Sequence, residues 1–202
     1  MDLAGKTLDD KYMLLEQIGE GGMGTVYAAV HRWTAKRVAV KVLQVEGSDL
    51  REAYYRFVRE ARSAARVEHP AIASVLDMGF DAAAGVPYIV QELLVGESLR
   101  TYMSRVQTMN FPVAAAILRP VFEGLAEAHA RRVVHRDLKP SNIFLTLDAK
   151  GNTTAKVIDF GIARLLDDDP TATEVRTQTG IVMGSPTYMA PEQVAGQTDL
   201  DA

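Results

Sequence analysis

The chain has 202 residues, of which 48% are hydrophobic and 24% are charged, and its formal net charge is -4. This composition is typical of a soluble globular protein with enough apolar side chains for one large core or two small ones. The negative charge argues against a nucleic-acid partner, and the absence of cysteine excludes disulfides and thiolate metal sites.

The beginning of the sequence carries no recognisable targeting signal. Residues 1–3, Met-Asp-Leu, lead into alternating charges without the apolar core of a signal peptide. No apolar run elsewhere reaches the roughly 20 residues that cross a bilayer. We therefore expect a cytoplasmic protein with no membrane segment in this chain.

The first predicted elements are two strands joined by a glycine-rich turn. Residues 12–18 form the first strand, residues 19–24 read Gly-Glu-Gly-Gly-Met-Gly, and the β-branched Thr25 and Val26 begin the second strand. A similar glycine pattern occurs at dinucleotide-binding turns, but there it opens a helix. The sequence therefore favours a β-hairpin, whose backbone amides can approach phosphate groups because no side chain intervenes.

A third strand is predicted for residues 37–43. Alternation places its three valines on one face and Lys41 on the other, among apolar neighbours. A lysine in such a place is most often an edge residue that extends its ammonium group to water. A carboxylate on a neighbouring element would change that interpretation.

The next predicted element, a helix from Asp49 to about Val67, supplies such a carboxylate. Asp49 and Glu52 have the spacing of a capping box, and Glu60 lies within the apolar stripe of the helix. A carboxylate on a buried face needs a counter-charge, because leaving it unpaired costs several kcal/mol. Lys41 is the natural partner, and local surface pairs of the neighbouring arginines are the alternative.

Residues 71–80 and 86–94 are predicted to be two further strands, which complete a small lobe of five strands and one helix. Residues 95–98 are interpreted as a hinge that leaves this lobe. By its sequence alone, the strand over residues 86–94 is also compatible with ordinary core β-sheet.

Two helices are predicted next, from Ser98 to about Gln107 and from Pro112 to about Arg131. The second helix is apolar on nearly every side, which predicts burial all round. Pro120 lies in its interior, where a proline removes a hydrogen bond and costs on the order of 3 kcal/mol unless a kink absorbs it.

The polar stretch His-Arg-Asp-Leu-Lys-Pro-Ser-Asn, residues 135–142, cannot be a helix because Pro140 interrupts it. The flanking apolar residues, 133–134 and 143–145, are predicted to be short buried strands. The polar side chains would then lie on a tight loop between fixed ends. A further polar residue, Asp159, follows an apolar run and precedes a Phe-Gly dipeptide.

Each of these polar residues suits one task in transferring a phosphoryl group to a hydroxyl. Asp137 can accept the hydroxyl proton, and Lys139 can neutralise charge on the transferred group. Asn142 and Asp159 can supply the hard oxygen ligands that Mg²⁺ prefers. The alternative is a polar surface turn with an unrelated Asp-Phe-Gly turn, but the two motifs in this order are far more specific than either alone.

In these motifs the chain resembles the protein kinases, and a lysine two residues after Asp137 is typical of their serine/threonine class. The resemblance runs from Lys11 to Ala202 and is greatest to the bacterial eukaryotic-like serine/threonine kinases. It implies an α+β, two-lobed kinase-like fold. Residues 1–94 would form the small antiparallel β lobe with one helix, and residues 95–202 an incomplete, mainly helical C-lobe.

The resemblance also implies the site residues and the cofactors, ATP and Mg²⁺, with Mn²⁺ as an alternative metal. In kinases the lysine at the Lys41 position pairs with the glutamate at the Glu60 position and holds the α- and β-phosphates. The catalytic residues would be Asp137, Lys139, Lys41 and Glu60, and the metal ligands Asn142 and Asp159. The expected ATP contacts are Ile18, Gly19, Gly21, Gly22, Gly24, Val26, Ala39, Lys41, Glu92, Leu94 and Phe144, with backbone groups of Glu92 and Leu94 holding the adenine.

After the Asp-Phe-Gly motif the sequence is rich in threonine. Thr177 and Thr179 look like the paired activation-loop threonines of bacterial serine/threonine kinases, whose phosphate Arg136 could receive. A solvated loop without a regulatory role is the alternative. On the first interpretation, autophosphorylation of these threonines would order the loop.

The last motif is Ala-Pro-Glu, residues 190–192, which follows Ser185 at a position that faces the substrate hydroxyl in this class. Small-molecule phosphotransferases usually lack this segment, so protein substrates are the preferred partners. A homodimer is a further partner left open.

The family continues with a central buried helix and several helices behind it, which have no counterpart in this sequence. We therefore expect a chain truncated within the C-lobe, and two classes of function stay open. One is an ATP-dependent protein serine/threonine kinase, with the activity of the 202-residue chain alone undecided. The other is a weak or inactive kinase-like module that binds nucleotide or a protein partner.

Overall fold

The computed structural model describes residues 2–21, 24–43, 58, 65–148, 151–159 and 186–194. The chain divides into two compact units. The first contains residues 1–65 and 74–94, and the second contains residues 66–73 and 95–202. The expected domains also met at residues 94 and 95, but they did not assign residues 66–73 to the second unit.

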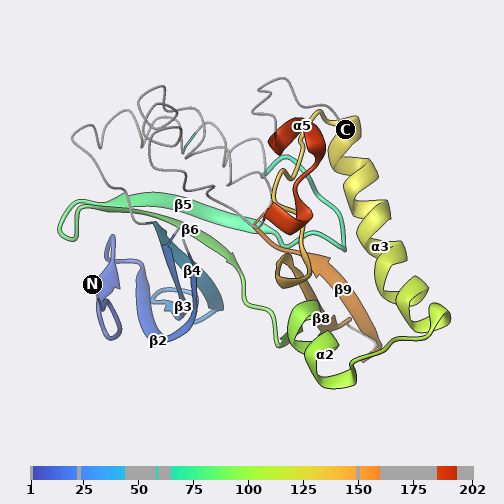
Figure 1. Cartoon of the computed structure of the whole chain (residues 1–202). Helices are drawn as coiled ribbons and strands as arrows, with labels where there is room; N and C mark the ends of the chain where they lie inside the picture. The colour runs from blue at the N-terminus through green and yellow to red at the C-terminus, as the bar shows by residue number, and fades with distance from the viewer. Residues whose placement is uncertain are drawn as a thin grey trace. The chain divides into compact units, whose positions relative to one another are not determined.

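The described part of the first unit is built on a six-stranded antiparallel sheet with the strand order β1-β2-β3-β4-β6-β5 (Figure 1). Its long central strands follow the alternating patterns of the sequence, and each pairs with a neighbour through a short connection. The strands are β1 (Thr7–Leu8), β2 (Tyr12–Gly21), β3 (Gly24–His31), β4 (Arg37–Leu43), β5 (Val75–Asp81) and β6 (Val86–Glu92).

The valines of β4 lie in the core of this unit, as the alternation predicts. Val38, Val40 and Val42 pack with residues of β2, β3 and β6. The opposite face of β4 is buried as well, because Ala39, Lys41 and Leu43 are all shielded from solvent. Lys41 is therefore carried by a strand that is buried on both faces.

The N-terminal segment is part of the same core, which the sequence did not indicate. Leu3 and Leu8 are buried, and the backbone N–H of Leu3 donates to the hydroxyl of Tyr27 at 3.2 Å. The N–H of Asp9 donates to Oδ2 of Asp81 at 2.7 Å, and the hydroxyl of Tyr88 donates to Asp9 at 3.3 Å. These long-range bonds attach the N-terminal segment, residues 3–9, to the sheet.

The described part of the second unit has a three-stranded sheet, β7-β8-β9, and two long helices. The strands are β7 (Gly96–Ser98), β8 (Ile143–Leu147) and β9 (Thr153–Val157), and the helices are α2 (Leu99–Val106) and α3 (Phe111–Ala130). A 3₁₀ turn, η1 (Pro140–Asn142), precedes β8, and a second, η3 (Pro186–Tyr188), precedes the short helix α5 (Pro191–Val194).

Residues 71–73 extend the small sheet at β9. The N–H of Ala73 donates to the carbonyl of Val157 at 2.8 Å, and the N–H of Val157 donates to Ala71 at 2.7 Å. Ile72 forms a parallel bridge with Val157 and is buried in the core of this unit. The predicted strand over residues 71–80 was therefore too long at its start. Residues 71–73 bond to β9 in the sheet of the second unit, and β5 begins only at Val75.

The cap residues explain where the two long helices begin. Ser98 and Asn110 have extended backbone, and their side-chain oxygens accept from the N–H groups of Thr101 and Val113. Such side chains satisfy backbone donors that have no partner within the helix. The predicted helices over residues 98–107 and 112–131 are confirmed within a residue at each end, with Pro120 inside α3.

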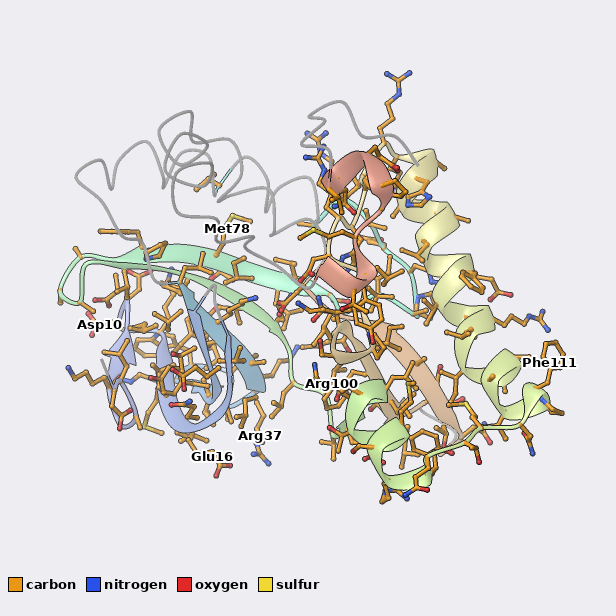
Figure 2. All side chains as sticks on the ribbon, in the orientation of Figure 1. Asp10, Glu16, Arg37, Met78, Arg100 and Phe111 are labelled. Atoms are coloured by element: carbon orange, nitrogen blue, oxygen red, sulfur yellow. The ribbon has the colours of Figure 1, made fainter. Side chains whose placement is uncertain are left out.

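Within the described residues, α3 is buried on one face and exposed on the other, so it is not covered all round. One face, which includes Ile117, Val121 and Leu125, packs in the core with β8 and β9. Phe111 is 83% exposed and Phe122 is 61% exposed, and Figure 2 shows Phe111 extending away from the start of the helix. Apolar composition therefore overstated the burial of this helix within the described residues.

Residues 133–134 are not a strand, since the N–H of Val133 donates to the carbonyl of Ala128 at the end of α3 instead of to a neighbouring strand. The predicted helix over residues 49–67 falls almost wholly outside the described residues. Among the helices of the described ranges, none is both long and apolar enough to cross a membrane.

Candidate functional site

The loop over residues 135–142 connects α3 to β8 within the second unit. The core that α3 shares with these strands holds both ends of the loop, where Val133 and Ile143 are buried. Between them the backbone departs from regular structure, since Arg136 has a φ of 65°, a conformation that residues other than glycine adopt rarely. The loop therefore has an irregular backbone between two ends that are anchored in the core.

Three polar side chains of this loop meet at one carboxylate. Nζ of Lys139 lies 2.8 Å from Oδ2 of Asp137, and both side chains are 22% exposed. Nδ2 of Asn142 donates to the same Oδ2 at 3.1 Å and to the backbone carbonyl of Asp137 at 2.8 Å. These contacts fix the carboxylate of Asp137 at the loop surface, where a second reactant could reach it.

The buried side chain of His135 connects this loop to the segment that follows β9. It is only 2% exposed, and its Nδ1 accepts from the N–H of Asp137 at 3.3 Å while Nε2 lies 3.0 Å from the carbonyl of Ile158. Since Nδ1 accepts, Nε2 carries the proton and donates, which defines the neutral tautomer. Burial also lowers the pKa of His135, against smaller opposing contributions from its hydrogen bond to Ile158 and from Asp159 and Asp137.

The backbone of Asn142 connects this loop to the segment that carries Asp159. The N–H of Ile158 donates to the carbonyl of Asn142 at 2.9 Å, just after β9 ends. Asp159 follows with a φ of 59°, so the chain turns sharply at this residue. The two oxygen-bearing side chains expected to bind a metal are therefore carried by hydrogen-bonded segments.

The expected phosphate-binding residues of the first unit lie on the β2–β3 hairpin and on β4. Val26 of β3 pairs with Lys41 of β4, and Lys41 in turn pairs with Ile89 of β6. Lys41 is 5% exposed. A charged side chain this well buried needs a partner, and Lys41 does take part in polar interactions.

Among the described glycines of the hairpin, Gly24 is the one at which the backbone leaves no room for a side chain. Its φ is 143°, and a Cβ atom there would lie 2.1 Å from the carbonyl oxygen of Val42. At Gly19 a Cβ would make ordinary contacts with Val26, and at Gly21 it would meet open space. Close approach of β3 to β4 therefore explains Gly24, whereas packing does not explain Gly21.

The remaining predicted ATP contacts are divided between the units. Ile18 on β2 is half exposed, and Ala39 on β4 is buried. Glu92 ends β6, where its N–H donates to the carbonyl of Ser74 at 3.1 Å and its Oε1 accepts from the N–H of Ser74 at 2.8 Å. Leu94 follows at the end of the first unit, and Phe144 lies on β8 of the second.

Several predicted site residues lie outside the described residues. They are Gly22 of the glycine-rich turn, Glu60 of the expected helix, the two threonines Thr177 and Thr179, and Ser185. The expected pair of Lys41 with Glu60 and the regulatory role of the threonines therefore stay predictions. Within the described ranges, no group of three or more histidine or acidic side chains is arranged to hold a metal ion.

The sequence analysis missed one residue that contacts the loop. Nε2 of Gln193 in α5 donates to the backbone carbonyl of Arg136 at 2.7 Å, and its Oε1 accepts from the N–H of Ala190 at 3.1 Å. A glutamine three residues after the N-cap position of a helix is a capping signal. The contact with Arg136 has no local signal, because the residues are far apart in the sequence.

Comparison with known proteins identifies the class. The protein kinase domain family matches residues 12–201, so the chain belongs to the protein kinase family. The serine/threonine-protein kinase PknA of Mycobacterium tuberculosis is 42% identical over 195 residues, which are 95% of this chain and 43% of PknA. The serine/threonine-protein kinase Pkn1 of Myxococcus xanthus is 41% identical over 200 residues, which cover 95% of this chain and 27% of Pkn1.

Solved structures confirm the fold class. The kinase domain of Mycobacterium tuberculosis PknI is similar with a TM-score of 0.72 and 29% identity, covering 100% of this chain and 71% of that domain. The expected α+β kinase-like fold is therefore correct. The chain spans less than half the length of the curated relatives it matches.

Proposed function

We propose that the chain carries the catalytic machinery of a protein serine/threonine kinase, which transfers the γ-phosphate of ATP to a Ser or Thr hydroxyl of a protein. The observation that carries this proposal is the carboxylate of Asp137, held by Lys139 and Asn142 on one loop. A carboxylate fixed in this way can orient an incoming hydroxyl and receive its proton. The names of the relatives support the same class of reaction.

The proposed reaction forms one bond, breaks one bond and transfers one proton. The substrate hydroxyl oxygen attacks the γ-phosphorus, the bond from that phosphorus to the β–γ bridging oxygen breaks, and ADP leaves. The hydroxyl proton passes to the carboxylate of Asp137. The ammonium of Lys139, 2.8 Å from this carboxylate, lies where it can also offset negative charge on the transferred group.

The donor set fits a hard divalent cation. Because Nδ2 of Asn142 donates to two oxygens of Asp137, the amide is oriented with its carbonyl oxygen directed away from that residue. Asn142 and Asp159 would hold Mg²⁺ through this oxygen and a carboxylate, and the ion would supply charge neutralisation at the ATP phosphates. Manganese has similar ligand preferences and is an alternative.

The first unit would supply the nucleotide contacts. Backbone amides at Gly19, Gly21 and Gly24 suit phosphate binding, and the buried ammonium of Lys41 suits the α- and β-phosphates. The carbonyl of Glu92 and the backbone of Leu94 would hold the adenine edge. Thr177 and Thr179 would be autophosphorylation sites, and Ser185 would face the substrate hydroxyl.

Matched variants test the proposal. We expect the wild-type chain to release ADP in the presence of a generic basic protein and to place phosphate on Ser or Thr. Asp137→Asn should retain magnesium-dependent ATP binding in calorimetry but lose turnover on the order of 100-fold or more, because the carboxylate acts in the transition state. Lys41→Met should weaken ATP binding itself.

The outcomes separate the alternatives. Magnesium-dependent ATP binding without any phosphoryl transfer by the wild type would contradict the kinase proposal and indicate a nucleotide-binding module. Absence of ATP binding to the folded chain would contradict the nucleotide site as well. Mass spectrometry of active protein tests the threonines, since an active preparation unmodified at both positions would rule out their regulatory role.

A further inference from the structure

We propose that Gln193 is a positioning residue for Asp137, which it controls through the backbone of Arg136. This inference rests on the proposed function, because Asp137 matters for activity only if the chain transfers phosphoryl groups. Gln193 belongs to α5, a short helix of the second unit that begins at Pro191, the proline of the last motif (Figure 1). Its carboxamide makes one bond to Ala190, the residue before α5, and one to the loop over residues 135–142.

The bond to the loop acts on the peptide unit that precedes Asp137. The carbonyl of this unit belongs to Arg136 and accepts from Nε2 of Gln193 at 2.7 Å. Its N–H belongs to Asp137 and donates to Nδ1 of His135 at 3.3 Å. Gln193 and His135 thus hold the two ends of one peptide plane, and the orientation of that plane determines where the Asp137 side chain starts.

The next backbone group is held as well. The carbonyl of Asp137 accepts from Nδ2 of Asn142 at 2.8 Å. Three successive polar groups of the backbone around Asp137 are therefore each bonded to a different side chain. Of these three side chains, Gln193 comes from outside the segment of residues 135–142, so it connects the loop to the distant end of the sequence.

The bond from Gln193 helps to hold Arg136 in an unfavourable backbone conformation. Arg136 has a φ of 65°, in the left-handed region that a residue with a Cβ atom avoids unless its surroundings impose it. Without the bond from Gln193, the peptide after Arg136 could rotate towards an ordinary conformation. Such a rotation would move the Asp137 carboxylate relative to Lys139 and Asn142.

The oxygen and the nitrogen of the carboxamide make different hydrogen bonds, so substitutions can remove one bond and keep the other. The oxygen accepts from the N–H of Ala190, as the third residue of a capped helix does, and a glutamate would do the same. The nitrogen donates to the carbonyl of Arg136, and a glutamate could not. A lysine has the opposite character, since it can donate to that carbonyl but cannot accept from Ala190.

The experiment compares four variants in steady-state kinetics and hydrogen exchange. Gln193→Glu keeps the helix contact alone, Gln193→Lys keeps the loop contact alone, and Gln193→Met removes both at similar length. Val194→Ala, at the exposed neighbour in the same helix, is the matched control. Thermal unfolding of each variant shows whether the chain remains folded.

We expect kcat to fall about fivefold to tenfold in the glutamate and methionine variants, with KM for ATP unchanged, because one hydrogen bond has been lost. The lysine variant should retain most of the turnover, and the control should match the wild type. A glutamate variant as active as the wild type, or a lysine variant as impaired as the methionine variant, would overturn the proposal and leave Gln193 as a helix cap.

Hydrogen exchange distinguishes failure of this inference from failure of the proposed function. Peptides covering residues 133–142 should exchange faster in the glutamate and methionine variants and at the wild-type rate in the lysine variant. This measurement needs no turnover, so it decides the loop contact even if the wild-type chain transfers no phosphoryl group. Unchanged exchange in all variants would contradict the positioning role.

Discussion

Lys139 and Asp137 form an ion pair of 2.8 Å in which each side chain is 22% exposed, and the residue between them, Leu138, packs against the core of its unit. Leu138 therefore anchors the backbone between the two charged residues in the core. Each side chain keeps some contact with water, which screens the pair and limits its contribution to stability. Its value lies in where it holds the carboxylate.

For this reason Lys139→Met should affect turnover more than stability. We expect kcat to fall on the order of tenfold to a hundredfold, with ATP affinity retained, because charge stabilisation near the transferred group is lost. Lys36→Met, at an exposed position of the β3–β4 turn, removes the same charge as a control. The interpretation would be wrong if both variants lost turnover equally, or if ATP affinity fell with kcat.

A second prediction concerns the glycine-rich hairpin. Gly24→Ala should destabilise the chain by about 1–3 kcal/mol, because the new Cβ would collide with the carbonyl of Val42 at a φ that favours glycine. Gly21→Ala should cost much less, since open space surrounds that position. Urea unfolding of both variants checks the contrast, and equal destabilisation would contradict it.

A third prediction follows from the lowered pKa of His135. In the folded chain burial keeps this imidazole neutral, whereas in the unfolded chain it takes up a proton near its ordinary value of 6.5. The unfolded state then binds more protons as the pH falls below that value, so the contribution of His135 to stability is complete above it and is lost towards lower pH.

The measurement compares the wild type with His135→Gln by chemical unfolding between about pH 5 and pH 8. The difference in unfolding free energy should rise with pH, by at most about 1.4 kcal/mol per pH unit for one proton, and then level off above the ordinary pKa. Titration of the other histidines cancels in this difference. A difference that is flat over the whole range, or that rises towards acid, would show that His135 is not buried as a neutral group.

A fourth prediction tests the orientation of α3. Leu125→Ala, on the buried face, should cost about 2–5 kcal/mol of unfolding free energy. Phe122→Ala, three residues earlier on the exposed face, should change it by about 0.5 kcal/mol or less. If the two substitutions cost the same, the helix would be covered on both faces, as its composition first suggested.

The sequence was sufficient for the elements in which local pattern and tertiary contacts agree. Alternation predicted β4 and the placement of its valines, and the predicted starts at Ser98 and Pro112 lie within a residue of the first residues of α2 and α3. Sequence patterns were insufficient where a short segment pairs with residues that are distant in the sequence. The two residues of β1 are too few to show a period, and Ile72 belongs to a bridge with Val157 that no local pattern indicates.

The same distinction applies to the candidate site. The spacing of Asp137, Lys139 and Asn142 predicted a cluster because one tight loop carries all three, and the structure brings them together. The contact of Gln193 with Arg136 joins segments that are distant in sequence, so only the folded chain reveals it. The apolar count of α3 misled because composition does not say which side of a helix a neighbour covers.

The assignment of residues 66–73 has a consequence for dissecting the protein. The chain enters the second unit at residue 66, returns to the first at residue 74 and leaves it again after residue 94, so the units are interlaced. Cutting between residues 94 and 95 would produce a second fragment without Ile72 and without the backbone partners of Val157. The second fragment should then not be an autonomous folding unit, and it should regain structure only when the first fragment is added, by complementation rather than by independent folding.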